Sequence, residues 1–518
     1  MSGKHLSVSI LDQAFQSNLM LPGVRIKPES YSFASLGGPD IGKLTAYGSK
    51  IDIWRLIDWL RAPVNIYDMR GDPVWWGYLH GVTVRVGAIE MGLTLEGFSN
   101  RVAVAYVSDT GARLTTSWVE DAESVSKYGS KEILGSLNDA QQAMAELYRT
   151  VLLNQLYRPQ PSIAISPGSS ALSASLELRG WWHTLDWQYC SQIKGEASHK
   201  DGSQVQQVGN VAGNTKVAQS FQADRTWFAS TLSLHVKIVG APADSLVVAI
   251  YSDSGGSPGG LLGSVTITAA SLSTTAAWAS GSLATPTSIT ASTPYWFQAS
   301  RTGALDAVNY YEVSVDEGLG YPDGSFKIYD GGAWVARTPD ADMLFSVIGV
   351  NENLSQITDL ITNFAQFITE IKFADSLTTS GVYTAAYRSG DTTTLAEVLS
   401  LLKTGTNSGK RLLAKVLFDR TLYIYEEPSY SRALPKYYVN GQGDILDKFH
   451  GNVLLHTCPV GDWCQLLDVI PASIDVHSVS DATYFFIEKS SYQVQSGRLN
   501  IEPRMPGNPW DVGGFDQG

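Results

Sequence analysis

The chain has 518 residues, a formal net charge of −13 and only 17% charged residues. The acidic balance excludes proteins that grip nucleic acid through phosphate contacts, because such contacts need clustered Lys and Arg; it is compatible with a wall past which DNA slides without binding. The length predicts roughly three or four domains of about 100–200 residues each, and a charge content below the usual ~25% predicts a surface that neighbouring subunits partly cover.

Residues 1–115 are expected to form a β-domain, a small barrel or sheet. Ser49 can cap a short helix that Pro63 ends, because a serine side chain accepts hydrogen bonds from the first helical N–H groups and proline cannot continue a helix. Strands are expected around this helix, at residues 64–67, 74–79, 82–86, 91–95 and 102–106.

Residues 116–198 and 351–430 are expected to form an α+β domain in two pieces. The clearest helix is predicted for residues 131–157. Its apolar stripe comprises Leu134, Leu137, Met144, Leu147, Tyr148, Val151 and Leu152. Further helices are predicted for residues 354–371 and 395–402, and a hairpin for residues 414–425. Residues 431–518 are expected to form a C-terminal β-domain and tail.

Residues 199–350 have the pattern of an antiparallel β-sandwich, or jelly roll, inserted between those two pieces. Leu232, Leu234, Val236 and Ile238 alternate with Ser233, His235 and Lys237. This period of two is typical of a half-buried strand, and it returns at residues 246–250 and 265–267 with Gly-, Pro- and Asp-rich turns between. The joint at residues 195–214 is polar, as linkers are. Insertions of this kind are tolerated where the entry and exit points lie close together on a surface.

Four residues near the turns of this sandwich are the candidate ligand-binding residues: Tyr321, Tyr329, Asp330 and Trp334. A flat ring can stack on a sugar while a neighbouring Asp bonds the sugar hydroxyls. Core packing is the alternative for each ring. Turn stabilisation is the alternative for Asp253, Asp316, Asp323 and Asp330, because an Asp side chain bonds the backbone two residues on.

Catalytic residues and cofactors are not predicted. A glycosidase needs two carboxylates at a defined separation in a cleft, and no such pair is recognisable in the chain. Calcium binding by the Asp-rich turns of the sandwich stays open, but no metal ligand is assigned.

Two short patterns imitate catalytic motifs. Residues 405–411 resemble a phosphate-binding loop, but the spacing is one residue short and Arg411 stands where Ser or Thr must reach Mg²⁺. Residues 124–127 and 403–405 match two of the three serine β-lactamase motifs, and the third is missing. Both patterns are interpreted as structural.

Three cysteines are too few, and too odd in number, for a disulfide scaffold. Cys458 and Cys464 lie near His450 and His456, but both pairs are separated by five residues, whereas zinc ligands are usually paired two to four residues apart. Buried thiols are therefore expected. His183, among tryptophans, is expected to be a packed core histidine.

The amino terminus has neither a basic start nor an apolar run, so no secretory signal is expected. No window of about 18 apolar residues occurs, so no membrane anchor is expected either. The protein is predicted to be soluble and made in a cytoplasm.

The inserted segment resembles the carbohydrate-binding-module-like jelly rolls of bacterial surface and secreted proteins. The resemblance lies in residues 219–223, 246–258, 294–296 and 329–334. It implies sugar binding, but it defines no ligand residue that can be transferred to this chain.

The rest of the chain is similar to tail hub proteins of long-tailed bacteriophages. The similarity lies in residues 74–106, 180–187, 387–397 and 423–428. It implies a homotrimer whose two β-domains per subunit form a pseudo-sixfold ring that joins the tail tube to the tip. The partners implied are the distal tail or tail tube protein, the tape-measure protein and the tail-tip proteins. Distal tail proteins also carry sugar-binding inserts, so a hexameric distal tail ring is the alternative.

These features together predict a structural virion protein at the tail tip, assembled in the host cytoplasm and without enzymatic activity. The inserted sandwich would be displayed to bind a host cell-surface glycan. Two alternatives remain: a carbohydrate-active enzyme with a binding module, and an insert that packs on neighbouring subunits without binding sugar.

Overall fold

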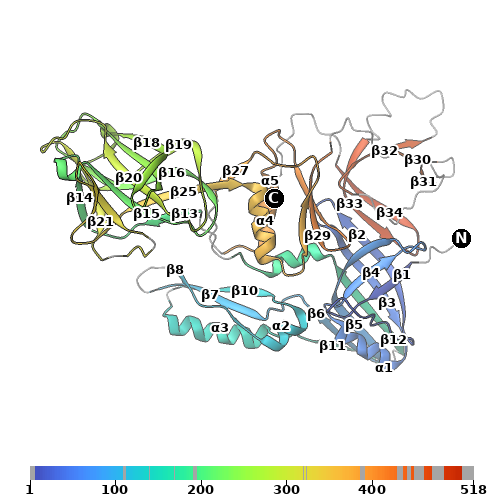
Figure 1. Ribbon diagram of the computed structural model, residues 1–518. Coiled ribbons are helices and arrows are strands. Elements are labelled where there is room, and N and C mark those ends of the chain that lie inside the picture. The colour runs from blue at the N-terminus through green and yellow to red at the C-terminus, as the bar shows by residue number, and fades with distance from the viewer. Residues whose placement is uncertain are drawn as a thin grey trace. The chain divides into compact units, whose positions relative to one another are not determined.

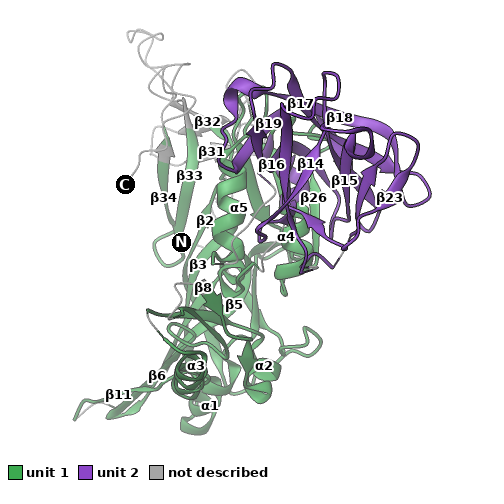
Figure 2. Cartoon of the chain, turned by 90° about the vertical axis from the view of Figure 1, so that its left-hand side faces the viewer, with its two compact units in different colours: residues 1–190, 357–382, 391–518 green, residues 191–356, 383–390 purple. Residues whose placement is uncertain are grey.

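A computed structural model describes residues 6–108, 113–138, 140–167, 170–190, 195–318, 320–322, 324–385, 391–428, 436–439, 445–447, 460–468 and 484–504. The chain forms two compact units (Figure 2). Unit 1 comprises residues 1–190, 357–382 and 391–518, and unit 2 comprises residues 191–356 and 383–390. Most regular elements are strands in antiparallel sheets (Figure 1), so the predicted multidomain, mainly β fold with α+β parts is confirmed.

Unit 1 is built on one large sheet. Its strands follow the order β1 (Ser7–Ile10), β4 (Pro63–Tyr67), β5 (Pro73–Gly87), β12 (Ala171–Arg179), β3 (Gly38–Tyr47), β2 (Arg25–Ala34), β33 (Tyr484–Gln493), β32 (Trp463–Asp468), β30 (Lys436–Val439) and β31 (Ile445–Asp447). Beside this path, β6 (Ile89–Thr94) pairs with β5 and β11 (Ser162–Ile165), and β34 (Arg498–Arg504) pairs with β33. The first and last parts of the chain therefore share one sheet.

Smaller sheets and short helices complete unit 1. One sheet contains β7 (Arg101–Val107), β8 (Arg113–Thr115), β9 (Val119–Glu120) and β10 (Glu132–Leu137), and another contains β26 (Glu370–Phe373), β28 (Leu412–Val416) and β29 (Thr421–Glu426). The helices are α1 (Lys50–Arg55), η1 (Leu56–Trp59), α2 (Ala122–Tyr128), α3 (Gln142–Leu156), η2 (Trp181–Trp187) and α5 (Thr394–Lys403), while α4 (Asn353–Phe364) begins in unit 2 and continues in unit 1.

Unit 2 is a sandwich of two sheets. One contains β13 (Glu196–His199), β25 (Phe345–Glu352), β16 (Trp227–Val239), β21 (Tyr310–Asp316) and β14 (Gln204–Val208), joined by β19 (Ala277–Ile289), β24 (Asp342–Met343) and β27 (Tyr383–Ala385). The other contains β18 (Pro258–Thr268), β17 (Ser245–Asp253), β20 (Tyr295–Arg301), β15 (Lys216–Phe221), β22 (Phe326–Tyr329) and β23 (Trp334–Ala336). Short turns η3 (Ala212–Asn214) and η4 (Ala269–Ser271) lie between strands.

The alternation read from the sequence places the core of the sandwich. Leu232, Leu234 and Val236 point inward from β16 and pack with large rings such as Phe297 and Phe345. The residues between them on β16 point outward. Burial of these side chains, at about 25 cal/mol per Å² of apolar surface, is the main force that closes the two sheets on each other.

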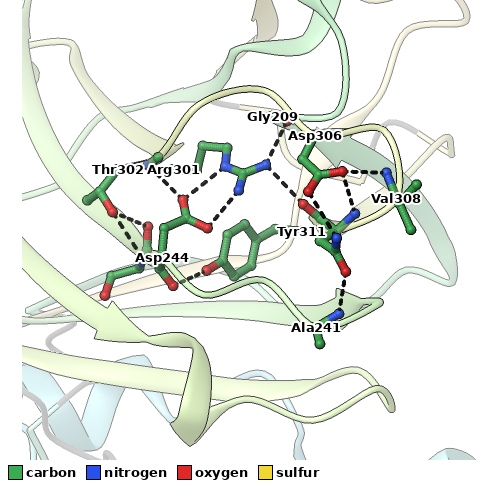
Figure 3. A network of polar contacts seen from close by, with 11 residues as sticks. Gly209, Ala241, Asp244, Arg301, Thr302, Asp306, Val308 and Tyr311 are labelled. Carbon is green, nitrogen blue, oxygen red and sulfur yellow. Dashed lines mark hydrogen bonds and ion pairs between the residues drawn. The ribbon is translucent and has the colours of Figure 1, made fainter.

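Polar contacts hold one end of the sandwich (Figure 3). Arg301 donates from Nε and Nη2 to the two carboxylate oxygens of Asp244, at 2.9 and 2.7 Å. Its Nη1 donates to the carbonyl oxygens of Gly209 and Asn309, both at 3.0 Å. Tyr311 Oη donates to the Asp244 carbonyl oxygen at 2.7 Å. One arginine thus joins the segments that precede β17 and follow β14 and β20.

The helix predicted for residues 131–157 is only partly correct. Residues 132–137 form β10, which pairs in parallel with β7 from Glu132 opposite Arg101 to Leu137 opposite Tyr106. The helix α3 begins ten residues later than Glu132, at Gln142. Long-range pairing with β7 satisfies the backbone of this segment, so tertiary contact overrides the helical spacing of its apolar residues.

The apolar side chains predicted to form one stripe along the helix do not all face the core in α3. Ala145, Tyr148 and Leu152 pack against a core that includes Val104 of β7. Leu147 lies on another face of the helix and is 61% exposed, and two further apolar residues, Met144 and Val151, are exposed as well.

The other local predictions have mixed outcomes. Ser49 caps α1 by accepting a hydrogen bond from the Asp52 N–H, as predicted. The helix at residues 395–402 and the hairpin at residues 414–425 are confirmed as α5 and β28–β29. The helix predicted for residues 354–371 is too long, because α4 ends at Phe364 and Ile371 pairs in β26 with Leu422 of β29.

The domain limits also differ from the expected ones. The inserted unit extends beyond residues 199–350, because β13 pairs with β25 and β27 adds another strand to the same sheet. The pieces expected as separate domains at residues 1–115, 116–198, 351–430 and 431–518 contribute to one compact unit 1. Most of residues 431–518, and residues 387–390 of the tail-hub similarity, lie outside the described residues.

Candidate functional site

Three of the four predicted binding residues lie together at one edge of the second sheet of unit 2. Tyr329 and Trp334 stand opposite each other in the β22–β23 hairpin, with ring centroids 5.3 Å apart at 61°. The Lys216 ammonium lies 5.4 Å from the Tyr329 ring centroid, from the neighbouring strand β15. We call Lys216, Tyr329, Asp330 and Trp334 the hairpin cluster. Its rings contact each other and a lysine, so part of each ring is covered.

Asp330 shapes the turn of this hairpin. Its Oδ1 accepts hydrogen bonds from the backbone N–H groups of Gly332 and Ala333, at 2.9 and 2.8 Å. These backbone bonds, Ala333 first, hold the pKa of Asp330 below its usual value. Asp253 and Asp316 accept backbone N–H groups in their turns in the same way, as the turn interpretation predicted. Asp323 lies outside the described residues.

Tyr321 is placed apart from the hairpin cluster. Its ring makes an edge contact with Phe345 in the core, with centroids 5.4 Å apart. Its backbone N–H donates to Asp342 Oδ2 at 3.1 Å. The structure therefore gives Tyr321 a packing role.

A loop at residues 254–257 covers the middle of the outer face of the second sheet, the sheet that carries the hairpin cluster at its edge. Trp296 points outward from β20, yet it is only 1% exposed. Its indole N–H donates to Asp253 Oδ1 at 2.7 Å, and the Lys327 ammonium lies over its ring at 5.5 Å. Lys327 also donates to Gly256 O and Ser257 Oγ, which ties residues 254–257 to this face. This large ring is therefore not available to a ligand.

The outer face of the first sheet is different. A row of serines crosses its strands in register: Ser280 on β19, Ser233 on β16, Ser346 on β25 and Ser198 on β13. Ser233 and Ser346 are only 6% and 3% exposed, whereas Ser280 at the end of the row is exposed. Ser233 and Ser280 share a hydrogen bond of 2.8 Å between their hydroxyls.

An exposed tryptophan stands beside this row. Trp278 is opposite His235 in the next register position of the β16–β19 pair. The indole is 41% exposed, whereas the other described tryptophans are buried or half-buried. The two ring centroids lie 5.3 Å apart at 57°, and His235 Nδ1 is 2.7 Å from Ser314 Oγ. We call Trp278, His235 and the four serines the serine face.

His235 presents a neutral ring on this face. Burial lowers the pKa of His235 below its ordinary value of 6.5, so the ring is uncharged near pH 7. Its Nδ1 is engaged by Ser314, and its Nε2 makes no hydrogen bond to any described residue. A neutral imidazole nitrogen can donate or accept a hydrogen bond according to its tautomer.

The charges beside the serine face are paired. Lys237 Nζ lies 2.9 Å from Glu312 Oε2, and Lys200 Nζ lies 2.6 Å from Glu196 Oε1. Ser346 Oγ also donates to Glu196 at 2.9 Å. Each carboxylate is neutralised by an adjacent ammonium group, so the face carries little net charge and suits an uncharged, hydroxyl-rich ligand.

Reasoning from the sequence missed Trp278. Residues 277–289 are rich in Ala, Ser, Thr and Gly and show little apolar alternation, so they were not predicted as a strand. A signal was nevertheless present, because Trp278, Ser280 and Ser282 occupy every second position, as side chains on one face of a strand do.

The described residues contain no group of three or more His, Cys, Asp or Glu side chains that could hold a metal ion. His450, His456 and Cys458, and the side chain of Cys464, lie outside the described residues. His183 pairs with Asp40, with Nε2 2.8 Å from Oδ1. In the described part of the chain, no helix is long and apolar enough to cross a membrane.

Comparisons with known proteins do not place the chain in a family. No family model and no curated protein matches it. Among solved structures, the Cry4Aa toxin of Bacillus thuringiensis is 7% identical over 60% of this chain and 57% of the toxin, with a TM-score of 0.15. A glycoside hydrolase family 43 arabinoxylan arabinofuranohydrolase from Bacillus subtilis is 11% identical over 57% of this chain and 65% of the enzyme, with a TM-score of 0.16. Particles derived from infectious bursal virus give 12% identity over 63% and 74%, with a TM-score of 0.15. At these TM-scores the likenesses carry no functional conclusion.

Proposed function

We propose that this protein is a structural subunit of the tail tip of a long-tailed bacteriophage, and that its inserted unit 2 binds a neutral host-surface glycan through the serine face. The tail role rests on the sequence similarity to hub proteins. The glycan role is carried by one observation: an exposed Trp278 beside a row of hydroxyls on a rigid sheet.

The chemistry of this face matches a pyranose ring. The flat, apolar side of a sugar can stack on the Trp278 indole, since aromatic side chains combine apolar area with a defined geometry. The exposed hydroxyl of Ser280, which Ser233 orients through their shared hydrogen bond, and the imidazole of His235 can exchange hydrogen bonds with the sugar hydroxyls. Because all these groups stand on paired strands, little conformational entropy is lost when the ligand binds.

Replacing Trp278 with alanine should weaken glycan binding at least tenfold, which corresponds to about 1.4 kcal/mol. The loss follows from removing the stacking platform while the hydroxyl row stays in place. The measurement is a glycan array with the full chain, followed by titration of the strongest hit against the wild type and Trp278→Ala.

Trp334→Ala provides the matched control, because it removes an indole from the hairpin cluster on the other sheet. Its affinity should stay within about threefold of the wild type. If Trp334→Ala loses binding and Trp278→Ala retains it, the glycan is bound at the hairpin cluster. If the array detects no glycan, the insert has no sugar-binding role.

The subunit role is supported by apolar side chains on the surface of unit 1. Leu147 on α3 and Ile163 on β11 are among its exposed apolar residues. In the described sheet β11 pairs only with β6, so its other edge has unpaired backbone groups of the kind that join subunits. Figure 2 shows β6 and β11 at the margin of unit 1.

Native mass spectrometry of the full chain should show a trimer, three times the 56.1 kDa chain mass. A charge at the exposed edge, Ile163→Glu, should shift the mass toward the monomer, because burying an unpaired carboxylate in an interface is costly. Leu261→Glu, at an exposed position of unit 2, is the control and should leave the mass unchanged. A mass six times that of the chain favours the distal tail ring, and a stable wild-type monomer contradicts both ring assignments.

The protein is proposed to bind the glycan without cleaving it. Both carboxylates that lie near the serine face, Glu196 and Glu312, are ion-paired with lysines. Burial tends to raise the pKa of Glu196, but hydrogen bonds from Lys200 and Ser346 outweigh it and lower that pKa, whereas a general acid must be protonated at the working pH.

A further inference from the structure

Three backbone segments of unit 1 meet with unusual conformations. Among the described non-glycine residues of unit 1, Phe15, Arg61 and Arg420 have positive φ angles of 62°, 70° and 67°. Phe15 lies in the turn after β1, Arg61 between η1 and β4, and Arg420 in the turn of the β28–β29 hairpin. Residues with side chains seldom adopt this region, so the surrounding contacts must hold all three in place.

Arg61 is buried, and its guanidinium has few hydrogen-bond acceptors. It is 5% exposed, and its Nη2 donates to the carbonyl oxygen of Gln13 at 3.3 Å. Its Nε and Nη1 are also buried and have no acceptor among the described residues. The guanidinium lies 5.0 Å from the ring centroid of Phe367. A buried guanidinium with unbonded N–H groups is costly unless an acceptor with negative charge completes it.

Arg420 brings a second positive charge to the same place. Its guanidinium lies 3.9 Å from the Phe15 ring centroid, and the side chain is half-buried. Burial and the charge of Arg420 lower the pKa of Arg61 to about 10. Neither arginine forms an ion pair with a described carboxylate. The adjacent Asp419 accepts the Thr421 N–H instead, at 3.0 Å.

A set of aromatic rings fixes the two guanidinium groups. The Trp181 ring contacts Phe15 and Phe367, with centroids 5.4 and 5.6 Å apart. Stacking on Phe15 and Phe367 offsets part of the two charges, but a ring face accepts no in-plane N–H group. The buried Nε and Nη1 of Arg61 therefore still need oxygen acceptors, and Arg420 adds a second positive charge beside them.

We propose that Arg61 and Arg420 form a binding site for a small oxyanion of the phosphate class. A tetrahedral oxyanion offers several acceptor oxygens and the negative charge that both groups lack, and guanidinium groups match such oxygens in pairs. Arg61 is too deeply buried for a polymer backbone to reach, so the ligand is a free anion. This site lies in unit 1 and is independent of glycan binding by unit 2.

Isothermal titration of the full chain with inorganic phosphate, in a chloride buffer of matched ionic strength, tests this site. The wild type should show saturable binding that chloride does not reproduce. Arg61→Met and Arg420→Met each remove one charge while keeping an apolar stem over the ring, and each should weaken phosphate binding at least tenfold. Arg25→Met, at an exposed arginine on β2, is the control and should bind as the wild type does.

Arg420 lies in an exposed turn, so Arg420→Met keeps the test valid if Arg61→Met does not fold. The absence of saturable phosphate binding to the wild type overturns the proposal, and so does unchanged binding by Arg420→Met. Dimethyl phosphate mimics a phosphodiester; if it binds as tightly as inorganic phosphate, the assignment to a free anion is overturned.

Discussion

Replacing Gly180 with alanine should destabilise unit 1 by about 3 kcal/mol or more, at the upper end of overpacking effects. A Cβ atom at this position would overlap the backbone carbonyl oxygen of Pro39, which cannot move away as a flexible side chain can. Gly180 also donates its N–H to Asp40 O at 2.7 Å, so β3 and the start of η2 are in direct backbone contact. Separating them would disturb the buried Trp181 and Trp182 that follow.

Urea unfolding of the full chain, followed by tryptophan fluorescence, measures this effect. Gly213→Ala is the control, because a Cβ there meets no atom within 4 Å. It should change the free energy of unfolding by less than about 0.5 kcal/mol. A Gly180→Ala protein as stable as the control would show that the close approach to Pro39 can relax without cost.

Replacing Arg301 with methionine should destabilise the sandwich of unit 2 by about 3–5 kcal/mol. This is the usual cost of removing one partner of a buried ion pair. The Arg301 and Asp244 side chains are largely buried, and the arginine also satisfies the carbonyl oxygens of Gly209 and Asn309. The change leaves a carboxylate and two carbonyl groups without their donor. Limited proteolysis of the full chain in urea should show earlier cleavage within unit 2.

The double change Asp244→Leu with Arg301→Met is the control for this prediction. Because it removes both charges, it should cost less than Arg301→Met alone. If the free energy of unfolding lost by the double variant instead equals the sum of the losses in Asp244→Leu and in Arg301→Met, the ion pair is not the source of the loss.

The pH dependence follows from the same pair. Burial tends to raise the pKa of Asp244, but hydrogen bonds from Arg301 and from the Gly303 N–H outweigh it, so the pKa is lowered from 3.8. A lowered carboxyl pKa contributes stability above the unfolded value, and that contribution is lost as the pH falls through the folded value. The stability difference between the wild type and Asp244→Asn should therefore be largest above pH 4 and shrink below it.

The sequence by itself determined the elements whose signals are local. The alternation from Leu232 to Ile238 encodes a half-buried strand whatever its neighbours are, and the caps of α1 and α5 depend on side chains next to their own helices. The pairing of Tyr329 with Trp334 was accessible for the same reason, since a short hairpin brings sequence neighbours together.

Only the tertiary structure decided which faces are covered and which distant groups meet. Residues 132–137 have helical spacing but become β10, because β7 offers a full set of backbone partners. Trp278 lies on the surface because the register between β19 and β16 places it opposite His235, on the face of the sheet that points away from the core. Arg61 and Arg420 are far apart in the chain, and no periodic pattern indicates that they meet beside Phe15 and Phe367. Local periodicity specifies which side of an element is apolar, whereas the partner of each side is chosen by pairing and packing over the whole chain.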